Sequence, residues 1–189
     1  MSFMITGKET SFTFGDLGFL NGTPDRILSK CVNLAEQLLV NSAAVISIRD
    51  VDTQRASFHS IGQNAHMLAI AGRFPLAGSL TQQICLENDL ISSIENHPMD
   101  WSPEMPEIKA FRAKGFVAAP IHGPAEEPIG MIACLTQTER DWNKEDFEAL
   151  EDVATLVTQR ILLKATLQTV KLMASETLSV ASARPARSH

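Results

Sequence analysis

Near the start of the chain, apolar residues recur with the period of an α-helix. Over residues 27–38 they recur every three or four positions, which predicts an amphipathic helix of about four turns. Thr23, Pro24 and Asp25 stand directly before it. A Thr cap, a proline in the first turn and an adjacent acid together indicate a helix start. Residues 1–22 mix Phe, Gly, Thr and Ser without a sustained period, and we interpret them as an arm.

Short apolar runs separated by turn signals predict antiparallel strands. Residues 43–49 and 55–61 flank a short acidic turn, so they form a predicted hairpin. Residues 116–121 and 129–136 form a second predicted hairpin around a polar, proline-containing loop. A further short strand is predicted at residues 90–94.

The middle of the chain predicts connecting helices and loops. Ser79 is placed to cap a helix that ends near Asn88. A second short helix covers residues 106–113, and the proline-rich stretch before it is predicted to be a loop. Residues 64–72 fit a short helix and an extended segment equally well.

The longest predicted element is a C-terminal helix. Asn143 caps it, acidic residues fill its first turns and basic residues come later, an order that complements the helix dipole. Its apolar pattern runs from Phe147 to Met173, which spans roughly 40 Å at 1.5 Å per residue. Residues 175–189 are predicted to be a disordered tail.

The order of these elements predicts an α+β fold in which helices pack on an antiparallel sheet. The strands come as hairpins rather than as strict βαβ units, which favours that class. A length of 189 residues fits one domain with extensions. We divide the chain into an N-terminal arm (1–22), one folded domain (23–165), and a helix extension with the disordered tail (166–189).

Composition and charge argue against several classes of protein. Apolar residues make up 44% of the chain and charged residues 20%, which is ordinary for a globular protein. The net charge of −6 argues against binding to nucleic acids or to anionic membranes, because such binders carry basic surfaces. No apolar run reaches about 18 residues, and the N-terminus lacks a signal-peptide pattern. We therefore expect a cytoplasmic protein.

Motifs of established catalytic classes are missing from the sequence. There is no HExxH, P-loop or GxGxxG motif, and the segment 78–80 lacks the second glycine of a nucleophile elbow. His59 and His66 could meet in space, but without a third ligand they predict no metal site. The cysteines are far apart and odd in number, so we interpret them as reduced, buried thiols. They are Cys31, Cys85 and Cys134.

Residues 115–157 resemble the C-terminal half of a GAF domain. Members of that family carry an apolar strand ending in Pro-Leu or Pro-Ile, here Ala119-Pro120-Ile121. A polar hairpin follows, and Ile-Gly then opens a second apolar strand, here Ile129-Gly130-Met131. An arginine near an aromatic residue comes next, here Arg140 and Trp142, before an acidic helix start.

The earlier half of the chain is also similar to this family. Residues 74–80 resemble the entry to the second GAF helix, and residues 89–91 resemble the strand after it. The resemblance covers residues 25–165. It implies a six-stranded antiparallel sheet flanked by helices, with a pocket for an unidentified small molecule between one sheet face and the segment 64–114.

The resemblance also implies a role. Most GAF domains catalyse nothing, sense a ligand and pass the signal through terminal helices, often as dimers. The chain resembles a stand-alone, bacterial sensor-type member, so its output would act on a signalling partner in trans. No cofactor is identified. Members that attach a bilin do so through a Cys commonly followed by His, a pair that this sequence lacks.

We place the ligand pocket on three sets of residues. Strand residues form one wall, connecting segments supply the cover, and the central strands form the floor. An apolar enclosure with few polar groups is the usual small-ligand site. The expected lining is Phe58 and Ser60 for the wall, His66, Phe74, Ser79, Gln82 and Trp101 for the cover, and Phe116, Ala118 and Cys134 for the floor. Each of these residues is also compatible with a plain core position.

Two alternative functions stay open at this point. The first is a thiol enzyme similar to free methionine-(R)-sulfoxide reductases, which are catalytic GAF proteins. Only Cys85 and Cys134 could approach the pocket, and the closely spaced thiols of that family are missing. The second is a ligand-free module for dimerisation or protein interaction, in which side chains fill the pocket.

A second apolar stripe on the C-terminal helix predicts a homodimer. Its spacing by threes and fours is that of a coiled-coil seam, although it is short. It extends past the expected end of the sheet, so leucine-sized side chains would stay in water without a partner. The N-terminal helix of the same chain is the alternative partner. The stripe consists of Leu156, Leu163, Leu167, Val170 and Ala174.

Overall fold

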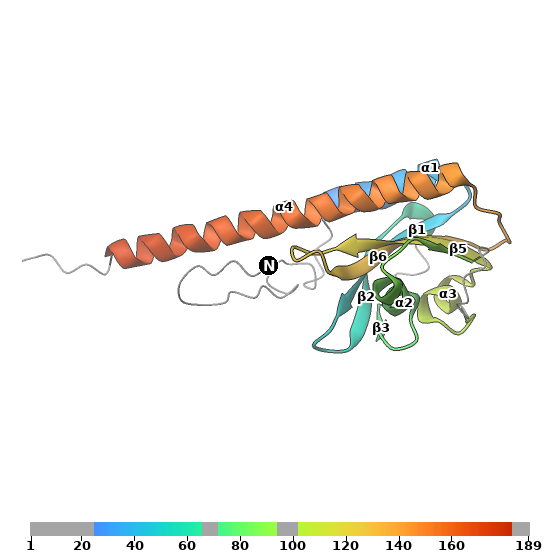
Figure 1. Cartoon of the computed structure of the whole chain (residues 1–189), viewed down its shortest axis with the longest axis horizontal. Coiled ribbons are helices and arrows are strands. Elements are labelled where there is room, and N and C mark those ends of the chain that lie inside the picture. Colours follow the sequence, from blue (N-terminus) through green and yellow to red (C-terminus); the bar gives the residue numbers. More distant parts are fainter. Residues whose placement is uncertain (1–24, 66–71, 94–101, 183–189) are drawn as a thin grey trace, which may run out of the picture.

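The computed structural model describes residues 25–65, 72–93 and 102–182. A six-stranded antiparallel sheet lies between helices on its two sides (Figure 1). This is the predicted α+β fold. The elements in chain order are α1 (Arg26–Leu38), β1 (Ala43–Asp50), β2 (Arg55–Ile61), β3 (Arg73–Pro75), α2 (Leu80–Glu87), β4 (Ile91–Ser92), α3 (Pro106–Phe111), β5 (Gly115–His122), β6 (Pro128–Thr136) and α4 (Lys144–Ser182).

The strands lie in the order β3-β2-β1-β6-β5-β4. Every neighbouring pair in this order is antiparallel. The hairpins β1–β2 and β5–β6 are the predicted ones, and their strands β1 and β6 pair at the centre of the sheet. Strand β3 was not predicted, because three residues with a proline among them are too few to show an alternation.

The two faces of the sheet belong to two separate cores. Ile46 and Ile48 of β1 and Val117 of β5 pack in the core under α1 and α4. Val45 and Phe116, one position along the same strands, pack in the core with α2 and α3. This follows from the alternation of side chains along a strand. Figure 1 shows α1 and α4 on one side of the sheet and α2 and α3 on the other.

A bulge in β2 changes which side chains share a face. Ser47 of β1 pairs with Phe58, whereas the adjacent Ile46 pairs with Ser60, so His59 is an extra residue between the two pairs. Directly paired residues point to the same face. Ser60 therefore lies with Ile46 on the α1 side, and the prediction that Phe58 and Ser60 face the same side is wrong.

Helix α1 is capped by a different residue from the one predicted. Oδ1 of Asp25 accepts hydrogen bonds from the amides of Ile27 (2.9 Å) and Leu28 (3.4 Å). Asp25 is thus the N-cap, with its carboxylate at the positive end of the helix. The predicted cap, Thr23, lies outside the described residues.

Helix α4 begins at a reciprocal cap. Oδ1 of Asn143 accepts from the amide of Asp146 (2.9 Å), and Oδ2 of Asp146 accepts from the amide of Asn143 (3.1 Å). The helix continues to Ser182, into the segment that we predicted to be a disordered tail. No helix among the described residues is long and apolar enough to cross a bilayer. The predicted inner stripe packs on the sheet, namely Phe147, Leu150, Val153, Ala154, Val157 and Ile161.

Candidate functional site

The face of the sheet under α2 and α3 is where we expect the ligand pocket. Phe116 and Ala118 of β5 are 1% and 0% exposed on this face. They pack in one core with Leu80 and Ile84 of α2 and with Ile108 of α3. The predicted floor residues of β5 are therefore covered by the two helices, as a pocket floor or a plain core would be.

Two predicted aromatic residues meet at the edge of this face. The rings of Phe58 on β2 and Phe74 on β3 have centroids 5.1 Å apart and are tilted by 51°. Phe74 is buried with Ala56 and Leu76 in a small cluster of its own. The half-buried Phe58 packs both on this cluster and on the core that contains Phe116. Phe58 therefore connects the β2–β3 edge with the centre of the sheet.

The predicted polar residues Ser79 and Gln82 stand at the start of α2. Oγ of Ser79 accepts from the amide of Gln82 (3.0 Å) and donates to the carbonyl of Leu76 (2.6 Å). Oε1 of Gln82 accepts from the amide of Gly78 (2.9 Å). The capping role predicted for Ser79 is confirmed, and contact of either residue with a ligand stays a prediction.

Two of the predicted lining residues lie on the opposite face of the sheet, and two others are not among the described residues. Cys134 of β6 pairs with Val117 and packs in the core under α1 and α4, so its predicted place beside Phe116 and Ala118 is wrong. The reason is that Val117, its partner on β5, faces α1 and α4, and directly paired residues point to the same face. Ser60 lies on that opposite face because of the bulge. His66 and Trp101 fall outside the described residues.

A buried carboxylate that the sequence analysis missed holds α2 and α3 together. Glu107 of α3 is 0% exposed. Its carboxylate accepts from the amides of Leu80 (3.0 Å) and Thr81 (2.9 Å) and from the hydroxyl of Thr81 (2.7 Å). The Thr81 hydroxyl also lies 2.8 Å from Oγ of Ser47 on β1. An acid in the first turn of a helix is ordinarily exposed, so the sequence carries no signal for this burial.

The thiols are buried, and Cys85 lies across the sheet from the other two. Cys31 and Cys134 pack in the core under α1 and α4, whereas Cys85 on α2 lies on the other face, 3.8 Å from the carbonyl of Gly130. Burial raises the pKa of Cys85 to about 11 and that of Cys134 to about 12. Burial, together with the charge of Asp25, also raises the pKa of Cys31. All three groups are therefore thiols rather than reactive thiolates at neutral pH.

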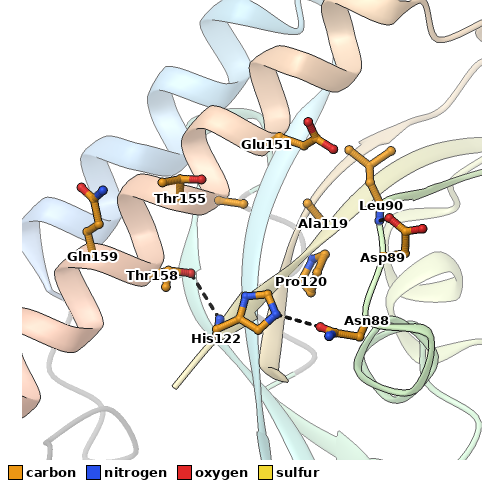
Figure 2. Close-up of a pocket in the computed structure, with 11 residues that line it drawn as sticks. Asn88, Asp89, Leu90, Ala119, Pro120, His122, Glu151, Thr155, Thr158 and Gln159 are labelled. Atoms are coloured by element: carbon orange, nitrogen blue, oxygen red, sulfur yellow. Dashed lines mark hydrogen bonds between the residues drawn. The ribbon is translucent and has the colours of Figure 1, made fainter. Parts of the chain in front are cut away.

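A pocket of about 370 Å³ lies on the α4 side of the molecule. We call it the α4 pocket (Figure 2). It lies between the end of α2, strand β5 and the first half of α4, and its lining includes none of the predicted site residues that the structure describes. Its lining residues are Asn88, Asp89, Leu90, Ala119, Pro120, His122, Glu151, Ala154, Thr155, Thr158 and Gln159.

Hydrogen bonds fix one end of the α4 pocket. Oγ1 of Thr158 accepts from the backbone amide of His122 (3.2 Å), and Nε2 of His122 lies 2.7 Å from Oδ1 of Asn88 (Figure 2). Asn88 ends α2 in the left-handed conformation (φ 55°), where its amide donates to the carbonyl of Ile84. The imidazole of His122 thus joins the end of α2 to the α4 side of β5.

Potential metal ligands do not gather in the described part of the chain. Among residues 25–65, 72–93 and 102–182, no three His, Cys, Asp or Glu side chains come close enough to hold a metal ion.

The chain belongs to the GAF domain family. The GAF domain profile matches residues 23–161, which is most of the chain. This confirms the resemblance seen in the sequence. GAF domains are typical of sensory signal-transduction proteins. No curated protein sequence matches the chain.

Solved structures of low sequence identity share the fold. A methyl-accepting chemotaxis protein superimposes with a TM-score of 0.63 at 20% identity, covering 80% of this chain and 98% of that chain. The GAF domain of a Bacillus halodurans two-component sensor histidine kinase gives 0.53 at 13% identity, covering 81% and 99%. Free methionine-R-sulfoxide reductase from Neisseria meningitidis gives 0.51 at 12% identity, covering 77% and 83%. The fold therefore occurs in sensors and also in an enzyme.

Proposed function

We propose that this protein is a sensory GAF domain that binds a small molecule on the α2–α3 face of the sheet, catalyses no reaction and acts as a homodimer. The observation that carries the ligand site is the aromatic path from Phe74 through the half-buried Phe58 to the core of Phe116. A few polar groups, Ser79 and Gln82 among them, stand near it at the start of α2. Such a combination is typical of small-ligand sites.

The thiols support a role without chemistry. A disulfide requires Cα atoms no more than about 7 Å apart. Cys85 is separated from Cys31 and Cys134 by the sheet, because it packs on the opposite face. The raised pKa values of these groups also oppose nucleophilic attack. A reaction that relays electrons between Cys85 and either of the other two thiols does not fit this arrangement.

Exposed apolar residues support the homodimer. Leu156, Leu163, Leu167 and Val170 of α4 are 46%, 53%, 50% and 57% exposed. Helix α1, which pairs with α4, exposes Ile27, Leu34 and Leu38 as well. Because each leucine-sized side chain gains about 1.5–3 kcal/mol on full burial, a second copy placed on these helices would be stabilised. The predicted seam through Leu163 and Leu167 is our proposed interface.

Native mass spectrometry of the freshly purified protein tests the ligand. We expect a mass above that of the bare chains, with the excess lost on denaturation. Phe58→Ala should release the ligand, because it interrupts the aromatic path. Phe147→Ala is the matched control: it truncates another half-buried Phe, on the opposite face, and should leave the ligand bound.

Two results of these experiments would contradict the proposed ligand site. The ligand-free interaction module would be favoured if every preparation gave only the mass of the chains themselves and if no small metabolite in a library raised the thermal unfolding temperature. Equal loss of ligand from both variants would show that the site is not on the α2–α3 face.

A further inference from the structure

The α4 pocket lies on the other side of the sheet from the proposed ligand site and has no role in that function. Its volume of about 370 Å³ falls within the range of small-ligand sites. We propose that the α4 pocket is a second binding site, which takes a small aliphatic amine. The proposal goes beyond the sensory function proposed above and does not depend on it.

Hydrogen-bond acceptors at the pocket define the polar part of this ligand. Glu151 and Asp89 are both exposed carboxylates of the lining, and Figure 2 shows Glu151 reaching from α4 toward Leu90. Oδ1 of Asp89 already accepts from the amide of Leu90 (2.8 Å). The described residues that line the pocket include no lysine or arginine. A ligand that brings a positive charge and several N–H donors matches this lining.

His122 adds an acceptor at the fixed end. Oδ1 of Asn88 is a carbonyl oxygen and can only accept, so Nε2 of His122 must be the donor in their 2.7 Å contact. In the neutral ring this leaves Nδ1 as an acceptor. Figure 2 shows the imidazole between Asn88 and Thr158, at the end of the pocket away from Glu151. The two ends of the pocket therefore both favour a donor.

The wall between these ends is apolar. Leu90, Ala119, Pro120 and Ala154 contribute it, and they carry no polar side-chain atoms. A short chain of methylene groups packs well on such a wall. An amine at each end of that chain would meet Glu151 at one side and His122 at the other. A short α,ω-diamine is thus the simplest member of the ligand class.

The position of the pocket on α4 keeps it open in the proposed dimer. At about 100° per residue, Glu151 and Thr158 lie about 80–100° to one side of the buried Leu150. Arg160, which contacts α1 through Asp25, lies about 80° to the other side. The exposed seam residue Leu163 lies on the α1 side too, about 140° from Leu150. Dimerisation through the seam would leave the Glu151 and Thr158 side of the α4 pocket accessible, with Gln159 of the lining at the margin of the seam.

Titration calorimetry of the full chain with 1,4-diaminobutane tests the proposal. We expect saturable binding of one diamine per chain, and no comparable binding of succinate, which has the same length but carries the opposite charge. Glu151→Gln should weaken diamine binding by about tenfold or more, because it removes a charged hydrogen-bond acceptor. Asp152→Asn is the matched control, since Asp152 is the next residue on α4, is exposed and does not line the pocket.

A second variant separates a built pocket from diffuse attraction. Thr155→Phe places a large ring in the pocket from an exposed helix position without changing the charge, and it should abolish diamine binding. Amide signals of His122 and Thr158 should shift on titration, whereas those around Phe58 should not. The proposal would be overturned if the diamine showed no saturable binding or if succinate bound equally well. It would also be overturned if Glu151→Gln and Asp152→Asn weakened binding equally, or if Thr155→Phe still bound the diamine fully.

Discussion

Glu107 accepts hydrogen bonds from the first turn of α2 although it belongs to α3. The first amides of a helix have no partner inside that helix, and here the amides of Leu80 and Thr81 receive a buried carboxylate. The negative charge also stands at the positive end of α2. One side chain thus fixes the position of α2 over the proposed ligand face.

Glu107→Gln should lower the free energy of unfolding by about 1.5–3 kcal/mol, because the charged acceptor is replaced by a neutral amide with one acceptor fewer. Urea denaturation measures this change. Glu104→Gln is the control, since Glu104 is 76% exposed in its pair with Lys109 and should cost less than about 1 kcal/mol. Equal losses in the two variants would contradict the anchoring role of Glu107.

Residue roles could be predicted from the sequence only where they are local. Ser79 and Asn143 cap helices as expected, because a cap needs no more than its own helix. Glu107 was missed because its partners are 26 and 27 positions away along the chain. Cys134 was placed on the wrong face because a continuous apolar strand does not reveal which side chains point to which core.

Asp25 connects the two helices that cover the other face. Its carboxylate caps α1 and also accepts from Nη2 of Arg160 on α4 at 2.9 Å, with Nζ of Lys164 3.6 Å away. Burial raises the pKa of Asp25, but the hydrogen bonds from Arg160 and from the amides of Ile27 and Leu28 outweigh it. The net pKa lies below the ordinary value of 3.8.

This shift predicts a dependence of stability on pH. A folded-state pKa below 3.8 means that the ionised carboxylate stabilises the fold above that pH, and that this stability is lost as the pH falls further, because the unfolded chain takes up the proton first. Asp25→Asn keeps a capping side chain but loses the charge. This substitution should lower the free energy of unfolding by about 1–3 kcal/mol at pH 7. It should also make the free energy of unfolding depend less on pH in the acid range. Asp152→Asn, on the exposed surface of α4, should leave the acid pH dependence of the unfolding free energy unchanged. If Asp25→Asn also left it unchanged, Asp25 would not be the group responsible.

Most elements could be predicted because their periods are strong, and the exceptions have identifiable causes. The β1–β2 and β5–β6 hairpins and α4 follow from apolar runs with clear turn or cap signals. The bulge at His59 could not be predicted, since an extra residue in one strand leaves the apolar pattern nearly unchanged. It nevertheless moved Ser60 out of the candidate site.

The whole molecule has a folded domain at one end of α4 and a helix that continues beyond the sheet (Figure 1). The family could be inferred from an ordered set of short motifs spread along the chain. The face on which we propose the ligand rests on the resemblance to that family and stays a prediction. The α4 pocket could not be inferred, because it combines the end of α2, strand β5 and α4, and each contributes only a few ordinary polar residues.

The exposed seam on α4 leads to a prediction about the oligomeric state of the whole molecule. Leu163→Glu with Leu167→Glu should convert a dimer into a folded monomer of 20.7 kDa, because the added charges cannot be buried between two copies. Light scattering after size exclusion measures the mass. Thr155→Glu with Thr169→Glu adds the same charge to the flank of α4 that carries the pocket, where no seam residue is three or four positions away, and should stay dimeric. A monomeric unaltered protein at micromolar concentration would reject the dimer.

The length of α4 has a mechanical consequence. Beyond Ala165, the last residue of α4 in the core under α1 and α4, the helix continues to Ser182. At 1.5 Å per residue this extension of the helix is a lever of roughly 25 Å. A tilt of about 10° at the sheet would move its tip by roughly 4 Å, a displacement larger than the rearrangement that causes it. A small change in the packing around α4 would thus be amplified at the far end of this helix.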